Sequence, residues 1–184
     1  MTVCPAHVEV ADRTRAAWQA SDMEFTLVQH FDAHLAEVVA LYSDPGFFTS
    51  LPPTTRLATP ELVMCEESEE VVLLRLRHRL TAELPAMVTK FVDPAKLTWV
   101  ETTTLDLSTL RSSSSLSPDE YPDLLRASAE AVFTAVDEGT TRAVTGRVEV
   151  PVPIFGGKVE AAIVEGLEEH LRGEETAARR RLDA

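Results

Sequence analysis

The C-terminal part of the sequence limits the fold more than any other feature. Between residues 141 and 153 apolar and polar side chains alternate, with Val144, Val148 and Val150 in the apolar row. This period of two is typical of a strand with one apolar and one solvated face, and it favours an antiparallel sheet. Prolines and a Gly-Gly pair end the strand, and apolar side chains at helical spacing predict a long helix over residues 158–180. The apolar face of the sheet needs a cover, and this helix is the longest that the chain offers.

The rest of the chain predicts six more strands and two short helices. A strand begins at Met23, a helix is expected from about 33 to 43 with Asp32 as its N-cap, and a second short helix follows at Asp44-Pro45. The predicted order is strand, helix, helix, six strands and the long helix. A short extra helix is expected near residues 84–92, from Leu84, Met87, Val88 and Phe91 at helical spacing.

This element order resembles the START-like, helix-grip superfamily, and within it a bacterial family of uncharacterised function. The segments that carry the resemblance are LPAMVTKFV, KLTWVETTTLDL and GRVEVPVPIFGGKVE, and it spans residues 23–182. It implies an α+β domain at 23–184, in which a curved seven-stranded antiparallel sheet wraps the C-terminal helix. Residues 1–22 are expected to form an N-terminal extension. The matching corner consists of Pro153, Gly156, Gly157 and Glu160.

The resemblance also implies a ligand class, because families of this fold bind lipids, sterols, polyketides or plant hormones between sheet and helix, and a few are cyclases or hydroxylase components. The metal-binding and iron–sulfur motifs of the hydroxylases have no counterpart in this sequence. The serine-rich segment 112–115 departs from the family pattern and leaves that part of the cavity wall undefined.

Charge and composition exclude several partners. The 184 residues contain 17 Lys and Arg against 30 Asp and Glu, for a net charge of −13. Nucleic acids and anionic membrane surfaces attract clustered cations, so neither is an expected partner. No apolar run approaches the ~20 residues of a membrane span, and the first residues do not resemble a signal peptide, so a cytoplasmic location without stable membrane insertion is expected.

Two side chains interrupt predicted apolar rows that face the helix. His78 follows Leu74 and Leu76, and three interpretations are open for it. It hydrogen-bonds a ligand carbonyl, acts as an acid or base near neutral pH, or is a core histidine that the backbone satisfies. Gln29 follows Phe25 and Leu27, and it is either a polar contact for a ligand or an amide that faces solvent at the sheet edge. The predicted ligand-binding residues are Phe25, Leu27, Gln29, Leu74, Leu76, His78, Trp99, Phe133, Val148, Val150, Ile163 and Leu167.

Motifs for metals, cofactors and nucleophilic catalysis are missing from the sequence. His30 and His34 are four residues apart, but a strand-to-helix boundary separates them, and Cys4 and His7 do not complete a ligand set. The acidic run 66–70 lacks the spacing of a calcium loop. No P-loop, dinucleotide fingerprint, GxSxG or CxxC sequence occurs, so no metal or cofactor is expected.

Three hypotheses for function follow. The first is a binding protein, for transport or sensing, that holds an apolar or amphipathic small molecule or lipid between sheet and helix. The second is a cyclase- or aromatase-like enzyme that uses the same pocket, with His78 as the proton carrier. The third is a protein-interaction module without a ligand, which predicts a packed interior. One set of apolar side chains either caps the pocket mouth as a lid, with Phe47, Phe48 and Leu51 across from it, or packs in the core: Leu84, Met87, Val88 and Phe91.

Overall fold

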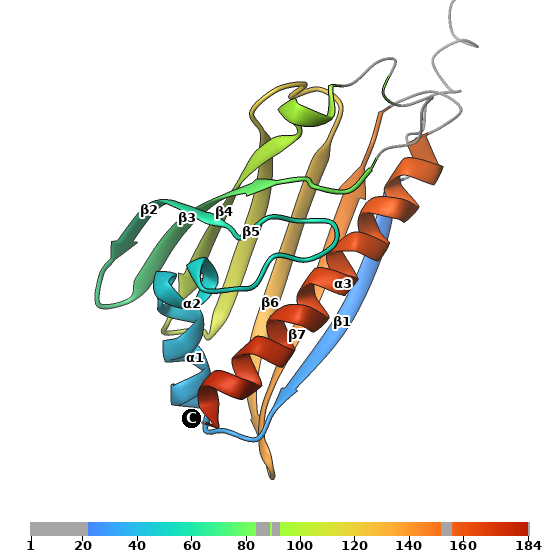
Figure 1. Ribbon diagram of the computed structural model, residues 1–184. Helices are drawn as coiled ribbons and strands as arrows, with labels where there is room; N and C mark the ends of the chain where they lie inside the picture. The colour runs from blue at the N-terminus through green and yellow to red at the C-terminus, as the bar shows by residue number, and fades with distance from the viewer. Residues whose placement is uncertain (1–21, 84–88, 90–92, 152–155, 184) are drawn as a thin grey trace, which may run out of the picture.

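The computed structural model of the chain describes residues 22–83, 89, 93–151 and 156–183. Seven strands pair antiparallel in a single sheet with the order β1-β7-β6-β5-β4-β3-β2, and α3 lies across one face of it (Figure 1). The predicted α+β helix-grip architecture is therefore confirmed. The elements are β1 (Met23–Phe31), α1 (Leu35–Ser43), α2 (Pro45–Thr49), β2 (Glu61–Glu67), β3 (Val71–Arg79), the 3-10 turn η2 (Pro94–Lys96), β4 (Thr98–Asp106), β5 (Arg111–Pro118), β6 (Arg126–Val136), β7 (Gly139–Glu149) and α3 (Gly156–Leu182).

Two predictions concern segments outside this description. The short helix expected near 84–92 falls almost entirely on residues that the structure does not describe, as does the N-terminal extension 1–22 apart from Asp22. The predicted N-cap at Asp32 is wrong, because α1 begins two residues later than expected. His34 precedes its first turn, and the Glu37 carboxylate accepts a hydrogen bond from the His34 N–H at 3.0 Å.

Strand register gives the sheet one inner face that looks toward α3. Gln29 of β1 pairs with Arg142 of β7, which pairs with Phe133 of β6, and His78 of β3 pairs with Trp99 of β4. Because side chains alternate along a strand, every second residue from these positions shares the inner face. In β5 and β6 this face carries the small side chains Ser112, Ser114, Ala127, Ala129 and Ala131 beside the larger Leu116 and Phe133. The small side chains leave space between the sheet and the helix.

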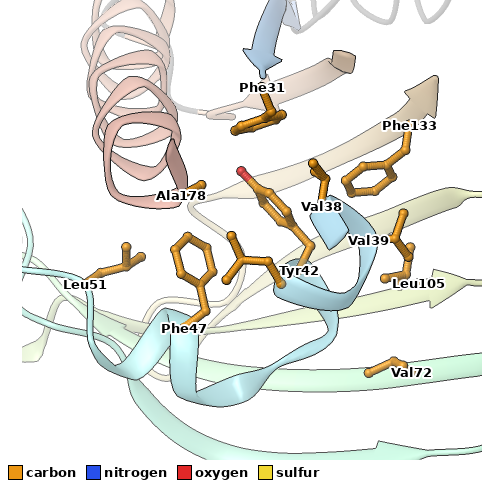
Figure 2. Packing of buried hydrophobic residues seen from close by; sticks show 11 residues of the cluster. Phe31, Val38, Val39, Tyr42, Phe47, Leu51, Val72, Leu105, Phe133 and Ala178 are labelled. Carbon is orange, nitrogen blue, oxygen red and sulfur yellow. The ribbon is translucent and has the colours of Figure 1, made fainter. Parts of the chain in front are cut away.

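Apolar packing forms two clusters. One cluster surrounds Tyr42 of α1, whose ring lies among Phe31, Phe47 and Phe133 (Figure 2). The Tyr42 ring makes edge-to-face contacts with these three rings and with Phe48, at centroid distances of 5.5–6.0 Å. The other lies where α3 crosses β1 and β7, and it contains Phe25, Ala131, Val144, Val148 and Val150 with Val159, Ile163, Leu167 and Leu171 of the helix packed against them. The C-terminal end of α3 reaches the first cluster through Ala178, so the helix contributes to both.

The described residues on either side of the connection between β7 and α3 lie close together. The carboxylate of Glu160, which is 2% exposed, accepts a hydrogen bond from the backbone N–H of Val150 at 2.8 Å. Gly156 starts the helix so close to β7 that a Cβ atom at this position would lie 2.5 Å from the Val150 carbonyl oxygen. The glycine and the carboxylate therefore fix how α3 leaves the sheet.

Alanine substitutions at the two adjacent glycines test this corner. Gly156→Ala should lower the free energy of unfolding by about 1–3 kcal/mol, because the methyl group overlaps the backbone of β7. Gly157→Ala is the matched control, since no atom lies within 4 Å of its added methyl group, and it should leave stability unchanged or raise it by up to about 1 kcal/mol. Urea unfolding of both variants measures the difference, and equal stabilities would contradict the close approach.

Candidate functional site

A layer of buried polar side chains separates the two apolar clusters. Arg142 Nη1 donates to Gln29 Oε1 at 2.7 Å and to Glu174 Oε1 at 3.0 Å, and Gln29 Nε2 donates to the Leu171 carbonyl of α3 at 2.7 Å. Gln29 is 0% exposed, so the alternative of a solvent-facing amide is wrong. Buried charges are tolerated where they are paired, and this layer pairs the guanidinium with a carboxylate from the helix.

Tyr42 closes the layer from the side of α1. Its hydroxyl donates to Gln29 Oε1 at 3.4 Å, and the Arg142 guanidinium carbon lies 4.5 Å from its ring centroid, which is cation–π geometry. Burial raises the pKa of Tyr42 well above its ordinary value, and the nearby Glu174 carboxylate raises it further. The phenol therefore stays protonated and remains a hydrogen-bond donor.

His78 and Glu101 form a second polar group farther along the inner face. His78 Nε2 lies 3.0 Å from Glu101 Oε2, but the ring N–H does not point at this oxygen, and neither ring nitrogen has a hydrogen-bond partner among the described residues. The imidazole is 3% exposed. Burial by itself raises the pKa of Glu101, but the contact with His78, supported by His170 and Arg142, outweighs it and lowers this pKa to about 2. Glu101 is therefore charged at neutral pH.

Two aromatic groups hold the His78 ring in place. Trp99 stacks on it with an interplanar angle of 10° and a centroid distance of 5.6 Å, and His170 of α3 meets it edge-on at 5.9 Å. Burial lowers the pKa of His170, although the Glu174 carboxylate opposes this shift. His170 is thus neutral at neutral pH, and the imidazole pair carries at most one positive charge.

A cavity of about 90 Å³ lies between the sheet, α2, the loop that follows α2, and α3. Its walls combine apolar side chains with both polar groups described above. The sheet contributes Phe25, Leu76, His78, Trp99, Glu101, Ser114, Leu116, Ala127, Ser128, Ala129, Arg142, Val144 and Arg147, the α2 region Phe48, Leu51, Leu57 and Pro60, and α3 Leu167, His170, Leu171 and Glu174.

Five of the twelve predicted ligand-binding residues line this cavity: Phe25, Leu76, His78, Trp99 and Leu167. The other seven lie outside its lining. Gln29 belongs to the polar layer, Phe133 to the cluster around Tyr42, and Val148, Val150 and Ile163 to the cluster under α3. Leu74 is buried, and Leu27 is half-buried. Of the predicted lid residues, Phe48 and Leu51 border the cavity.

Four polar residues of the site were not predicted from the sequence: Arg142, Glu101, Glu174 and His170. The inner position of Arg142 could have been predicted, because it stands two residues before Val144 in the same alternating row. Glu101 likewise stands two residues after Trp99. Glu174 and His170 lie on α3 one turn apart, where acidic side chains are frequent, and no pattern in the sequence separates the buried ones from the exposed ones.

The loop between α2 and β2 runs across the sheet toward α3 (Figure 1), and its residues Leu51, Leu57 and Pro60 border the cavity. The Thr81 N–H donates to the Arg56 carbonyl at 2.8 Å, and Leu57 forms an isolated bridge with Leu80. The Arg56 side chain crosses to α3, where it pairs with Glu169 at 3.0 Å and Glu165 at 3.6 Å. The ion pairs to α3 are exposed and therefore weak, whereas backbone contacts hold the loop to the end of β3.

Neither metal sites nor membrane spans are found in the described part of the chain. No group of three or more His, Cys, Asp or Glu side chains there is arranged to hold a metal ion. Among the same residues, no helix has the length and apolar character needed to cross a membrane.

Comparisons with known proteins agree with the architecture. The model of the family described as "Protein of unknown function (DUF2505)" matches residues 26–182. The chain belongs to this family. A comparison with curated proteins gives no match.

Solved structures place this DUF2505 member in the START-like fold. The protein TTHA0849 of Thermus thermophilus is 22% identical with a TM-score of 0.60, covering 87% of this chain and 97% of its own. The Zhui aromatase/cyclase of Streptomyces sp. R1128 is 15% identical with a TM-score of 0.57, covering 89% and 93%. Norcoclaurine synthase of Thalictrum flavum is 13% identical with a TM-score of 0.57, covering 98% and 95%. At these identities the likeness establishes the fold alone.

The low pKa of Glu101 predicts how stability depends on pH. Because its folded-state pKa of about 2 lies below the ordinary 4.5, the charged carboxylate adds stability that is complete above about pH 4.5 and is lost as pH falls toward 2. The difference in unfolding free energy between the native chain and Glu101→Gln should therefore shrink over this range, from at most about 3 kcal/mol. Glu165→Gln removes a carboxylate that is 72% exposed and controls for net charge. A difference that stays constant between about pH 5 and pH 2 would contradict the coupling to His78.

Proposed function

We propose that the protein binds an apolar or amphipathic small molecule between the sheet and α3, as a carrier or sensor in the cytoplasm. The observation that carries this proposal is the cavity, whose apolar walls surround the buried His78 and Arg142. Ligand sites of this kind combine mostly apolar walls with a few polar groups that orient the ligand. The predicted residues Phe25, Leu76, His78, Trp99 and Leu167 form the contact surface.

The size of the cavity indicates how a ligand enters. Its volume of about 90 Å³ is smaller than the roughly 150 Å³ of an engineered apolar cavity that holds benzene. A ligand as large as one aromatic ring therefore displaces part of the wall, and the loop around Arg56 is the part that exposed contacts hold to α3. Larger ligands, such as a lipid chain, require a larger movement of the same loop.

Toluene is a suitable probe for this proposal, and Ala129 is the position at which to block it. Ala129 lines the cavity, and Ala129→Leu adds three carbon atoms to a space of about 90 Å³, so toluene affinity should fall at least about 10-fold. Thr134→Leu on the exposed part of β6 is the matched control and should bind as the native chain does. Ligand-observed NMR measures the toluene affinity of the native chain and of both variants, and thermal melts check that the variants fold. If the native chain does not bind toluene, the result supports the hypothesis of a protein-interaction module, which needs no cavity.

A second function, cyclase- or aromatase-like catalysis, is favoured by the contact between His78 and Glu101 inside the cavity. A carboxylate next to an imidazole stabilises its protonated form, which helps the imidazole to accept a proton from a substrate. Two of the similar structures are an aromatase/cyclase and a synthase, which agrees with this alternative.

Acetophenone in D2O distinguishes binding from catalysis. If His78 removes a proton from the carbon next to a carbonyl group, the native chain should accelerate exchange of the methyl protons, and His78→Ala should abolish the acceleration. Under binding alone, His78→Ala weakens affinity modestly and exchange stays at the rate without protein. NMR of the methyl signal follows the exchange, with Ala129→Leu as the control for access to the cavity.

A further inference from the structure

Two side chains that border the cavity carry buried nitrogen atoms without hydrogen-bond partners among the described residues. They are Nδ1 and Nε2 of His78 and Nε of Arg142. The side chains are 4% and 11% exposed, respectively. Buried polar atoms in native proteins are rarely left unsatisfied, and those that are often belong to functional sites.

The charges around the cavity are already balanced or negative. Arg142 is paired with Glu174, and Arg147, which also borders the cavity, is engaged with Asp22 and Glu24. Glu101 is charged, with His78 as its neighbour. His170 is kept neutral by burial, which lowers its pKa. The described residues therefore provide no spare positive charge for an anionic ligand.

We propose that the ligand presents an uncharged oxygen, the hydroxyl of a phenol or the carbonyl of a ketone, to His78 and Arg142, and that the site rejects carboxylates. This inference rests on the proposed binding function and narrows its ligand class. A carboxylate would bring a further negative charge next to Glu101 and Glu174 in a site with little water, whereas an uncharged oxygen satisfies the nitrogens without adding charge.

Hydrogen-bond chemistry favours oxygen over a purely apolar ligand. The imidazole of His78 has one donor and one acceptor nitrogen when neutral, and a hydroxyl group can serve either of them. Arg142 has donors only, so its Nε–H pairs only with an acceptor such as oxygen. A hydrocarbon in the same place would leave all three nitrogens buried and unsatisfied.

Toluene, phenol and benzoate test this inference, because they share one ring and differ in the group attached to it. At pH 7 phenol is uncharged and benzoate is an anion. Isothermal titration calorimetry of the native chain should show that phenol binds about 10-fold more tightly than toluene. Benzoate should bind at least about 10-fold more weakly than phenol. The inference would be overturned if toluene or benzoate bound as tightly as phenol. Either result would still be consistent with the proposed binding function. If none of the three binds, the binding function itself fails.

Two variants separate the hydrogen-bonding and charge arguments. His78→Phe keeps a ring on Trp99 but removes both nitrogens, so the ratio of phenol affinity to toluene affinity should fall by about 10-fold. Glu101→Gln removes a negative charge, so the ratio of benzoate affinity to phenol affinity should rise by about 10-fold. Thermal melts check that each variant folds. If His78→Phe does not fold, the affinities of the three ligands for the native chain and for Glu101→Gln still test the inference.

Discussion

The buried contact of Arg142 with Glu174 and Gln29 is the interaction on which the rest of the structure depends. It joins β1, β7 and α3 at one point, and Tyr42 of α1 lies against it. Removal of Arg142 or Glu174 would leave the other charge buried and unpaired, which typically costs about 3–5 kcal/mol. An apolar layer would hold the helix as strongly but would allow it to slide, whereas directed hydrogen bonds fix one position of α3 on the sheet.

This fixed position explains where the cavity lies. The polar layer stops the two apolar clusters from merging, and α3 is held away from the inner face of β5 and β6, where the side chains are small. Trp99 and His170 then keep His78 at the edge of the remaining space. The cavity is thus a consequence of how polar and small side chains are distributed, and no long insertion is needed to form it.

The sequence predicted the fold better than the site, and the reason is physical. Alternation in β3 and β7 and the corner at Gly156 and Glu160 are local patterns, so the order of elements along the chain and the cover by α3 could be predicted from them. The contacts of the site join positions as far apart in the chain as Gln29 of β1 and Leu171 of α3, which are 142 residues apart, and no local pattern encodes them. His78 was found because it interrupts an apolar row. Glu174 was missed because its neighbours on α3 are also acidic and only packing distinguishes it.

Under the proposed function, different strands would determine the orientation and the size of the ligand. His78, Glu101 and Arg142, which would orient it, belong to β3, β4 and β7, whereas Ser114 and Ala129, whose small side chains leave the space, belong to β5 and β6. A change from alanine to valine or from serine to leucine on β5 or β6 would alter the available volume without touching any charged group. The size of the ligand would then diversify by single substitutions while the mode of anchoring stayed constant.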